Sequence, residues 1–266
     1  MDPAASNPED APGGRVFFGD RAVARDEKPS LVRGVFEDVA GGYDVMNDLM
    51  SAGVHRAWKR ALVDALNPAA PIRMADVAGG TGDIAFRVWE RLRRSRGRDG
   101  AVDSRITVCD LTPAMVERGR DRALDRGIVD GIDFVVGDAQ ALPFGDRGMN
   151  AVTNAFGLRN VTDAPAALRE ARRVLCRGGR FLCLEFGGPV MPGLAGLVDA
   201  YTDRVLPVLG AAVLGKGDAY RYLAESIRRF PARDVVANWM EDAGLNRVRT
   251  QPLSGGIATL YSAWRL

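Results

Sequence analysis

The sequence predicts an α/β fold with a mostly parallel sheet that is covered by helices on both faces. Short apolar strands alternate with helical segments between residues 72 and 186. A glycine-rich turn, Gly79-Gly80-Thr81-Gly82, follows the first of these strands. The two apolar segments at the C-terminus are expected to form an antiparallel pair at the sheet. The 266 residues suffice for one domain with a well-buried core.

Bulk composition argues against several classes of protein. The net charge of +2 creates no strong field, so we expect no nucleic-acid partner. Three cysteines without C-x-x-C spacing and a single histidine argue against a zinc site, and we expect no metal. The sequence holds no apolar run of about 18 residues, so we expect no membrane-spanning helix.

The N-terminal stretch, MDPAASNPEDAPGG, is acidic and rich in proline and glycine. It lacks the basic and apolar regions of a secretory signal, and its acidic residues argue against a transit peptide. We expect residues 1–30 to form a flexible arm and residues 31–266 to form a single domain.

Two helices are expected before the sheet begins. From Val32 to Met50, apolar residues recur at steps of three and four, which is typical of one buried helix face. Residues 51–53 interrupt this pattern, and a second helix is expected from His55 to Leu66 with Trp58 on its apolar side.

The alternating region follows and is expected to supply the parallel strands. Strands are expected at 72–80, 106–110, 132–139, 150–156 and 180–186. Helices are expected at 83–94, 113–124 and 165–175, and Pro113 stands where the first turn of a helix tolerates proline.

The C-terminal part changes character. Residues 188–230 contain prolines, glycines and a long apolar stretch, which we interpret as a lid inserted into the domain. A helix is expected at 232–243, closed by Gly244. Segments 245–253 and 257–266 then read as two strands.

The charges near the glycine turn indicate which ligand it serves. Such turns bind dinucleotides or S-adenosylmethionine. Asp83 stands where the next helix begins, and its carboxylate would repel a pyrophosphate. Asp76, Asp110 and Asp138 end, or nearly end, neighbouring strands. Four carboxylates around one crevice favour a ligand with a sulfonium and an ammonium group. Taken alone, Asp83 is equally well explained as a helix cap.

Two of these acids have specific expected roles. Asp110, at the end of the second strand, is placed to accept hydrogen bonds from both ribose hydroxyls. Asp138 and Ala139, after the third strand, are expected beside the adenine, with Asp138 accepting from the exocyclic amine. A turn aspartate and a small packing residue remain the alternatives for each position taken alone.

The segment Asn154-Ala-Phe-Gly-Leu-Arg-Asn160 ends the fourth strand, where an acceptor would meet the donor's methyl group. Arg159 carries a permanent charge that could hold a phenolate or order a water molecule. A structural ion pair with one of the aspartates is an equally good explanation of this arginine.

Several motifs together resemble the UbiE/COQ5 family of quinone-ring C-methyltransferases, from Val32 to the C-terminus. The first contains Tyr43, Asp44, Met46, Asn47, Ser51, His55 and Trp58. The others are DVAGGTGD at 76–83, FGLRNVTD at 156–163, the RVL-to-LEF run at 173–186 and YRYLAESIR at 220–228. Three positions depart from the family pattern: Ala155 replaces a frequent serine, Cys176-Arg177 replace Lys-Pro, and Gly187 replaces a serine.

The resemblance implies a Rossmann-like class I methyltransferase fold with a seven-stranded, mostly parallel sheet and an antiparallel C-terminal strand. It also implies S-adenosylmethionine as donor and a reduced polyprenyl quinone ring as acceptor, in ubiquinone or menaquinone biosynthesis. The expected donor-binding residues are Gly79, Gly80, Thr81, Gly82, Asp110, Asp138, Ala139 and Ala155. The expected catalytic residues are Arg159, Tyr43 and Asn160, whereas a lone histidine such as His55 is more often structural than a general base.

The same resemblance suggests where the enzyme works. Its polyprenylated quinol substrate is too apolar to cross water freely. We therefore expect a cytoplasmic enzyme, or a matrix enzyme in a mitochondrion, in peripheral contact with the membrane or with a quinone-biosynthesis complex. A homodimer remains open. The helices at 36–58 and the apolar segment 194–214 are expected to wall the acceptor site.

Three alternative functions remain at this point. A nicotinamide-dependent short-chain dehydrogenase would need Tyr-x-x-x-Lys, and none of the five tyrosines has a lysine four residues later. A non-catalytic scaffold of the same fold and a methyltransferase for another phenol are the other two.

Overall fold

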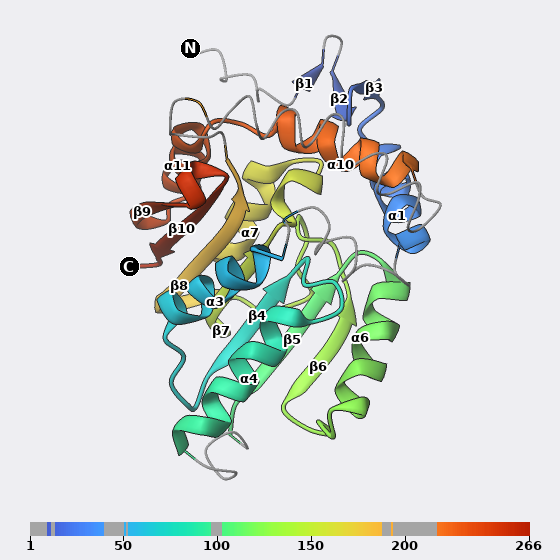
Figure 1. The fold of residues 1–266 in the computed structure, drawn as a ribbon. Coiled ribbons are helices and arrows are strands. Elements are labelled where there is room, and N and C mark those ends of the chain that lie inside the picture. Colours follow the sequence, from blue (N-terminus) through green and yellow to red (C-terminus); the bar gives the residue numbers. More distant parts are fainter. Residues whose placement is uncertain are drawn as a thin grey trace.

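Seven strands of the described residues form one mixed sheet at the centre of the molecule (Figure 1). The structure is a computed structural model that describes residues 10–11, 14–39, 51, 53–96, 103–187, 193 and 217–266. The strand order is β6-β5-β4-β7-β8-β10-β9. The bounds are β4 Arg73–Val77, β5 Arg105–Asp110, β6 Ile132–Val136, β7 Met149–Ala155, β8 Leu175–Phe186, β9 Asn246–Leu253 and β10 Ala258–Trp264.

The strand directions confirm the predicted fold class. Strands β4 to β8 run parallel to one another. Each connection between consecutive strands therefore returns the chain to the same end of the sheet. Strand β10 runs antiparallel to β8, with Tyr261 opposite Cys183, and β9 runs antiparallel to β10. The 3-10 turn η4 (Ser254–Gly256) joins β9 to β10.

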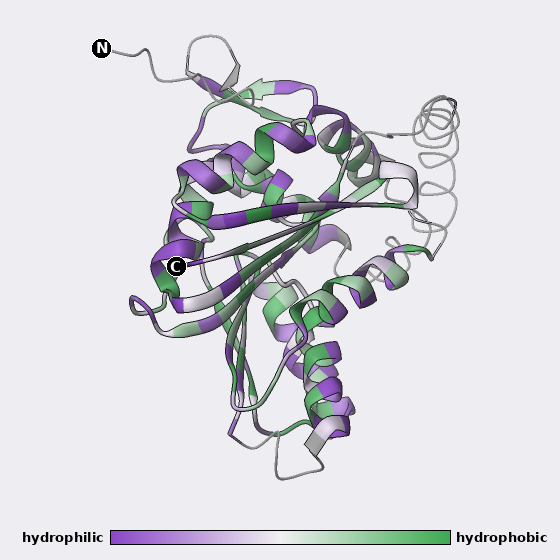
Figure 2. Ribbon diagram, turned by 90° about the vertical axis from the view of Figure 1, so that its left-hand side faces the viewer, coloured by the Kyte–Doolittle hydropathy of each residue, from purple (hydrophilic) through white to green (hydrophobic). Residues whose placement is uncertain are grey.

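Helices cover both faces of the sheet, which makes three layers; Figure 2 views the sheet obliquely with helices on either side. Adjacent residues of a strand point to opposite faces, so Met74 packs into one apolar cluster and Ala75 into the other. The first cluster includes residues of α3 (His55–Leu66), α4 (Asp83–Arg96) and α6 (Pro113–Asp125). The second includes residues of α7 (Ala164–Val174) and α11 (Arg233–Asp242).

The range predicted as a loose arm contains regular structure in this protein. A second small sheet joins β1 (Asp10–Ala11), β2 (Arg15–Phe18) and β3 (Arg21–Val23). Val16 and Val23 are buried, and the ring of Phe18 stacks on Tyr222 at 4.4 Å between centroids. These contacts come from tertiary packing rather than from local pattern, which explains why short strands here escape sequence reasoning.

Two helices lie at the end of the sheet to which the parallel strands point (Figure 1). Helix α1 (Lys28–Val39) begins earlier than predicted, because Pro29 fits its first turn. Helix α10 (Gly217–Arg229) lies within the range that we interpreted as an inserted lid. Residues 40–50 and the apolar segment 194–214 lie outside the described residues. None of the described helices is long and apolar enough to cross a membrane.

Candidate functional site

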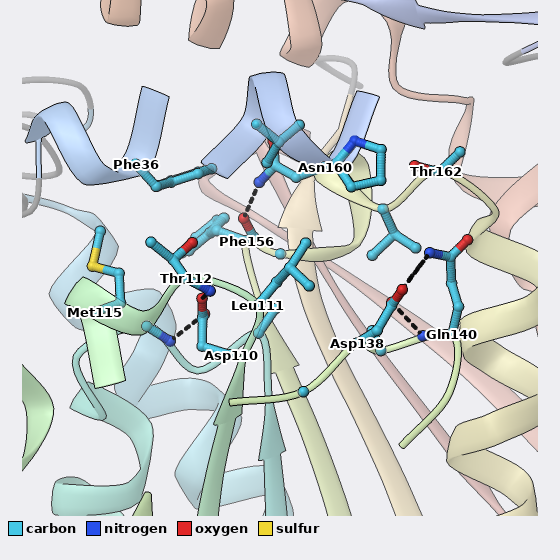
Figure 3. A pocket seen from close by; sticks show the side chains of 18 residues that line it. Phe36, Asp110, Leu111, Thr112, Met115, Asp138, Gln140, Phe156, Asn160 and Thr162 are labelled. Atoms are coloured by element: carbon cyan, nitrogen blue, oxygen red, sulfur yellow. Dashed lines mark hydrogen bonds between the residues drawn. The ribbon is translucent and has the colours of Figure 1, made fainter. Parts of the chain in front are cut away.

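A hollow of about 700 Å³ lies at the carboxyl ends of the parallel strands. In sheets of this kind, ligands bind at this edge. Figure 3 shows Phe36 on one side of the hollow and Asp110 and Asp138 on the other. The lining comes from α1, from the turns after β4, β5, β6 and β7, and from the start of α6: Pro29, Val32, Phe36, Ala78, Gly80, Asp110, Leu111, Thr112, Met115, Gly137, Asp138, Ala139, Gln140, Phe156, Gly157, Asn160, Val161 and Thr162. We call it the main pocket.

The glycine turn brings its backbone close to neighbouring atoms. A Cβ on Gly79 would lie 2.8 Å from the carbonyl oxygen of Asp76 and 2.9 Å from the Val108 side chain. Gly82 has φ +85°, and a Cβ there would lie 3.1 Å from the Phe134 ring. Gly82 does not line the main pocket. Ala78 at the start of the turn has φ +51°, a left-handed conformation that is costly for a residue with a side chain.

Asp110 lies in the floor of the main pocket and is anchored by two backbone groups. The Gly80 N–H donates to Oδ2 at 2.8 Å, and the Thr112 N–H donates to Oδ1 at 2.9 Å. Burial raises the pKa of Asp110, and these two hydrogen bonds work against that rise. The Thr112 side chain also hydrogen-bonds to this carboxylate. Since a carboxylate has about four lone-pair sites, Asp110 keeps acceptor capacity for a ligand.

Asp138 and Ala139 follow β6 and line the same pocket. The Gln140 N–H donates to Asp138 Oδ1 at 2.8 Å, and the Gln140 side-chain amide donates to both carboxylate oxygens. These hydrogen bonds within the turn agree with the alternative that Asp138 is a turn aspartate. That alternative does not exclude a ligand, because the carboxylate remains part of the pocket wall.

The four acidic residues do not share one crevice, which corrects the prediction that they would. Asp110 and Asp138 line the main pocket, whereas Asp76 and Asp83 line a smaller hollow of about 310 Å³. Ala78 borders both hollows. We call the smaller one the side pocket; it is lined by Lys59, Asp76, Ala78, Gly79, Thr81, Asp83, Ile84 and Ala155.

Cations from α3 and α4 hold Asp83. Lys59 Nζ lies 2.9 Å from Asp83 Oδ2, and Arg87 Nε lies 3.3 Å from Oδ1. Burial alone would raise the pKa of Asp83, but the charges of Lys59 and Arg87 outweigh it and lower the pKa to about 2. Thr81, on the same rim, accepts a hydrogen bond from Arg122.

Asp76 lies deeper and has an unusual environment for a carboxyl group. It is fully buried, and the Thr153 hydroxyl donates to Oδ1 at 2.7 Å. Its Oδ2 has no hydrogen-bond partner among the described residues. Burial raises the pKa of Asp76 to about 7, although the hydrogen bond from Thr153, the backbone N–H of Ala85 and the charge of Lys59 oppose the rise. Asp76 is therefore poised to exchange a proton near neutral pH.

This shift predicts how stability depends on pH. Since the folded-state pKa is raised, the stabilisation present below the ordinary value of about 4 is lost as pH rises to about 7. Urea unfolding from pH 5 to 8 should show wild-type protein losing about 3 kcal/mol more than Asp76→Asn, which cannot titrate. Equal pH slopes in the two proteins would contradict the assignment.

The segment after β7 forms the far wall of the main pocket. Asn154 donates to the Val77 carbonyl at 3.0 Å and thereby joins the ends of β7 and β4. Phe156 has φ +61°, so it is left-handed like Ala78, which also lines the main pocket. Asn160, in the 3-10 turn η2 (Leu158–Asn160), lines the pocket and accepts a hydrogen bond from Tyr222 at 3.0 Å.

Arg159 does not line the main pocket. Its guanidinium lies 3.1 Å from Glu185 Oε2, and both side chains are buried. It also donates to the Phe156 carbonyl, and it borders a neighbouring hollow beside Tyr222. The partner in this ion pair is thus a glutamate of β8 rather than one of the aspartates that the sequence suggested.

The motif around the only histidine is described from residue 53 onward and at Ser51. The Ser51 hydroxyl lies 2.8 Å from His55 Nδ1, and His55 is buried. Trp58 packs against Phe156 and Phe186, and its indole N–H donates to Ser254 at 2.9 Å. Trp58 therefore supports the pocket wall from behind. Tyr43 lies outside the described residues.

Several lining residues were not singled out from the sequence: Leu111, Thr112, Met115 and Gln140. Leu111 and Thr112 directly follow β5, and Met115 lies in the first turn of α6, so their position after a strand-ending aspartate is the signal that could have identified them. Gln140 lies in a loop without a pattern of its own. Phe36 of the predicted acceptor-side helices does line the pocket.

The chain is similar to characterised sequences along nearly its whole length. The sequence model of the ubiE/COQ5 methyltransferase family matches residues 21–265. A protein of Nitrobacter hamburgensis, named ubiquinone/menaquinone biosynthesis C-methyltransferase UbiE, is 49% identical over 97% of this chain and 100% of its own length. The protein of the same name from Methylobacterium nodulans is 51% identical over 94% of this chain and 96% of its own.

Solved structures share the fold at low sequence identity. A SAM-dependent methyltransferase from Thermotoga maritima has a TM-score of 0.58 at 17% identity, covering 88% of this chain and all of its own. One from Aquifex aeolicus has a TM-score of 0.53 at 12% identity, covering 92% of this chain and all of its own.

Proposed function

The chain belongs to the ubiE/COQ5 methyltransferase family, and on this basis we propose the reaction that it catalyses. It transfers the methyl group of S-adenosylmethionine to a ring carbon of a polyprenyl benzoquinol or of demethylmenaquinol, in ubiquinone or menaquinone biosynthesis. The single observation that carries this proposal is the identity of about half of all residues to proteins named for that reaction, over their full length.

The pockets support a specific placement of the donor along the strand ends. Asp138 and Ala139 receive the adenine after β6, and Asp110 receives the ribose hydroxyls after β5. The remaining part of the donor then extends past Ala78 toward β4 and β7. The other proposed donor-binding residues border that path or shape the turn: Gly79, Gly80, Thr81, Gly82 and Ala155.

The residues present fit such a donor. Asp110 lines the main pocket and keeps acceptor capacity beyond its bonds from Gly80 and Thr112. The donor supplies an activated methyl on a sulfonium, and acidic residues in both pockets suit its positive charges. Ala155 offers no side-chain hydrogen bond where a serine is frequent, so any contact there is with the backbone.

Carbon methylation places two demands on the protein. A ring carbon becomes a good nucleophile when a ring hydroxyl loses its proton, so the site must stabilise a phenolate. It must also align the acceptor carbon with the methyl group. Good orientation of the reactants can lower the free-energy barrier by about 7–11 kcal/mol. The fixed wall of Phe156, Gly157 and Asn160 supplies such alignment.

We assign the acceptor side to Asn160, Arg159 and Tyr43. Of Asn160 and Arg159, only Asn160 lines the main pocket, so it is the one that can contact the acceptor there. Arg159 cannot accept a proton, because a guanidinium stays protonated in proteins. Its contacts with Glu185 and the Phe156 carbonyl make it a positioning residue that holds this wall, and Tyr43 completes the proposed set.

The acceptor's polyprenyl tail implies a partner surface. We propose that the enzyme is cytoplasmic and meets the membrane, or a quinone-biosynthesis complex, peripherally to receive its substrate. The apolar residues Val32 and Phe36 of α1 provide a suitable wall on the open side of the main pocket. A homodimer is compatible with this arrangement.

A methyl-transfer assay tests the function. Purified protein with methyl-labelled S-adenosylmethionine should methylate a demethylated benzoquinol, demethylmenaquinol or both, as detected by mass spectrometry. Reaction mixtures kept oxidised are the control and should give no product, since a quinone carries no ionisable hydroxyl. Absence of product with every reduced acceptor, or tight binding of NADH in place of the donor, would contradict the proposal.

A further inference from the structure

The side pocket contains a buried lysine that the assignments so far leave without a role. Lys59 comes from α3, the helix that packs against β8 and α4, and its side chain is 7% exposed. Its ammonium donates to Asp83 at 2.9 Å. Burying an ammonium is costly unless it is paired, so its position in the wall of a hollow calls for a physical reason.

Lys59 shares its carboxylate partner with a second cation. Arg87 contacts Asp83 from the other side, at 3.3 Å. Asp76, the second acid of this pocket, is held by Thr153, and its Oδ2 is buried against the glycine turn, where a Cβ on Gly79 would lie 2.9 Å from it. The side pocket thus offers a buried ammonium in its wall, which suits the carboxylate of a ligand.

The proposed donor placement brings a zwitterion to this pocket. With adenine beyond β6 and ribose beyond β5, the donor continues toward β4 and β7. Ala155 at the end of β7 and Gly79 after β4 both border the side pocket. The part of the donor that points in this direction is its amino-acid end, which carries a carboxylate and an ammonium.

We propose that Lys59 binds the α-carboxylate of the donor's amino-acid end in the side pocket. This inference rests on the proposed function, since it assumes S-adenosylmethionine as donor. It makes Lys59 a specificity residue for donors with an intact carboxylate. An ammonium has three N–H donors, so Lys59 can keep its contact with Asp83 while it binds the ligand.

A purely structural role would have a different signature. If Lys59 only tied α3 to α4 through Asp83, its removal would weaken the fold and would affect every donor analogue alike. Comparison of ligands that differ in the amino-acid end therefore separates the two roles. S-adenosylhomocysteine retains this end, its decarboxylated analogue lacks the carboxylate, and 5′-methylthioadenosine lacks the whole amino acid.

The experiment measures the affinity of these ligands by calorimetry. Wild-type protein should bind S-adenosylhomocysteine about 10- to 100-fold more tightly than the decarboxylated analogue, the range for one charge-assisted hydrogen bond. Lys59→Met should lose this preference, with less than about threefold change in affinity for 5′-methylthioadenosine. Arg87→Met is the matched control: it removes the other cation on Asp83 and should keep the preference.

Three results would overturn the inference. One is a wild-type protein that binds the decarboxylated analogue as tightly as S-adenosylhomocysteine. Another is Lys59→Met with the full preference, and a third is an equal loss for all three ligands. If Lys59→Met does not fold, Lys59→Gln and the wild-type comparison still decide. Failure of wild-type protein to bind S-adenosylhomocysteine at all would instead contradict the proposed function.

Discussion

Replacing Asp110 with alanine is expected to weaken donor binding by at least about 100-fold. The carboxylate is anchored by the Gly80 and Thr112 N–H groups, so its free lone pairs stay aimed at the pocket. Two ribose hydroxyls would each lose a charge-assisted hydrogen bond in the variant. Calorimetric titration with S-adenosylhomocysteine measures the loss directly and does not depend on turnover.

A ligand control separates this contact from damage to the glycine turn. An analogue without the 2′- and 3′-hydroxyls should bind wild-type protein weakly, and Asp110→Ala should weaken its binding little further. Asp133→Ala is the matched protein control, because Asp133 lies on β6 and pairs with Arg105 at the surface. Unchanged donor affinity in Asp110→Ala would remove the ribose assignment.

Replacing Arg159 with alanine is expected to cost both stability and turnover. Glu185, which is fully buried, would be left without its cation, and breaking a buried pair in this way costs about 3–5 kcal/mol. The Phe156 carbonyl would also lose the Arg159 donor and keep only the longer bond from the Asn160 amide among the described residues, at 3.4 Å, so the wall that orients the acceptor would relax. Urea unfolding measures the first effect. Steady-state kinetics should show kcat reduced at least about tenfold, while donor affinity survives.

The double variant Arg159→Met/Glu185→Leu distinguishes the two effects. Removing both charges should recover most of the lost stability, whereas kcat should stay low because the Phe156 carbonyl still lacks its hydrogen bond from Arg159. The shape of the kcat–pH profile should match wild type in Arg159→Lys, since a positioning residue supplies no proton acceptor. Full turnover in Arg159→Ala would show that Arg159 has no part in the reaction.

Local pattern was sufficient for most of the fold. The five parallel strands are buried apolar runs bounded by polar or glycine residues, and α3 was predicted at both ends from the spacing of Trp58, Leu62 and Leu66. The small N-terminal sheet and α10 were not predicted. Phe18 and Tyr222 stabilise each other across 204 residues of sequence, and no local window contains such a contact.

The site was predictable where it depends on strand ends and not where it depends on helix packing. The carboxylates of Asp110 and Asp138 follow from their places after β5 and β6. The side pocket is lined in part by Lys59, which reaches Asp83 because α3 packs beside α4. The partner of Arg159 lies on the adjacent strand β8, 26 residues away, and sequence spacing could not choose Glu185 over the aspartates.

Helix α1 packs against β2, α10 and α6, and its residues Val32 and Phe36 still wall the main pocket. In the proposed placement, the turns at the strand ends bind the donor, and α1 of the N-terminal layer covers it. This division would allow substitutions in the N-terminal layer, or its redesign for a different ring or tail, without a change in the turns that bind the donor. Acceptor choice and donor affinity can then evolve as nearly independent traits.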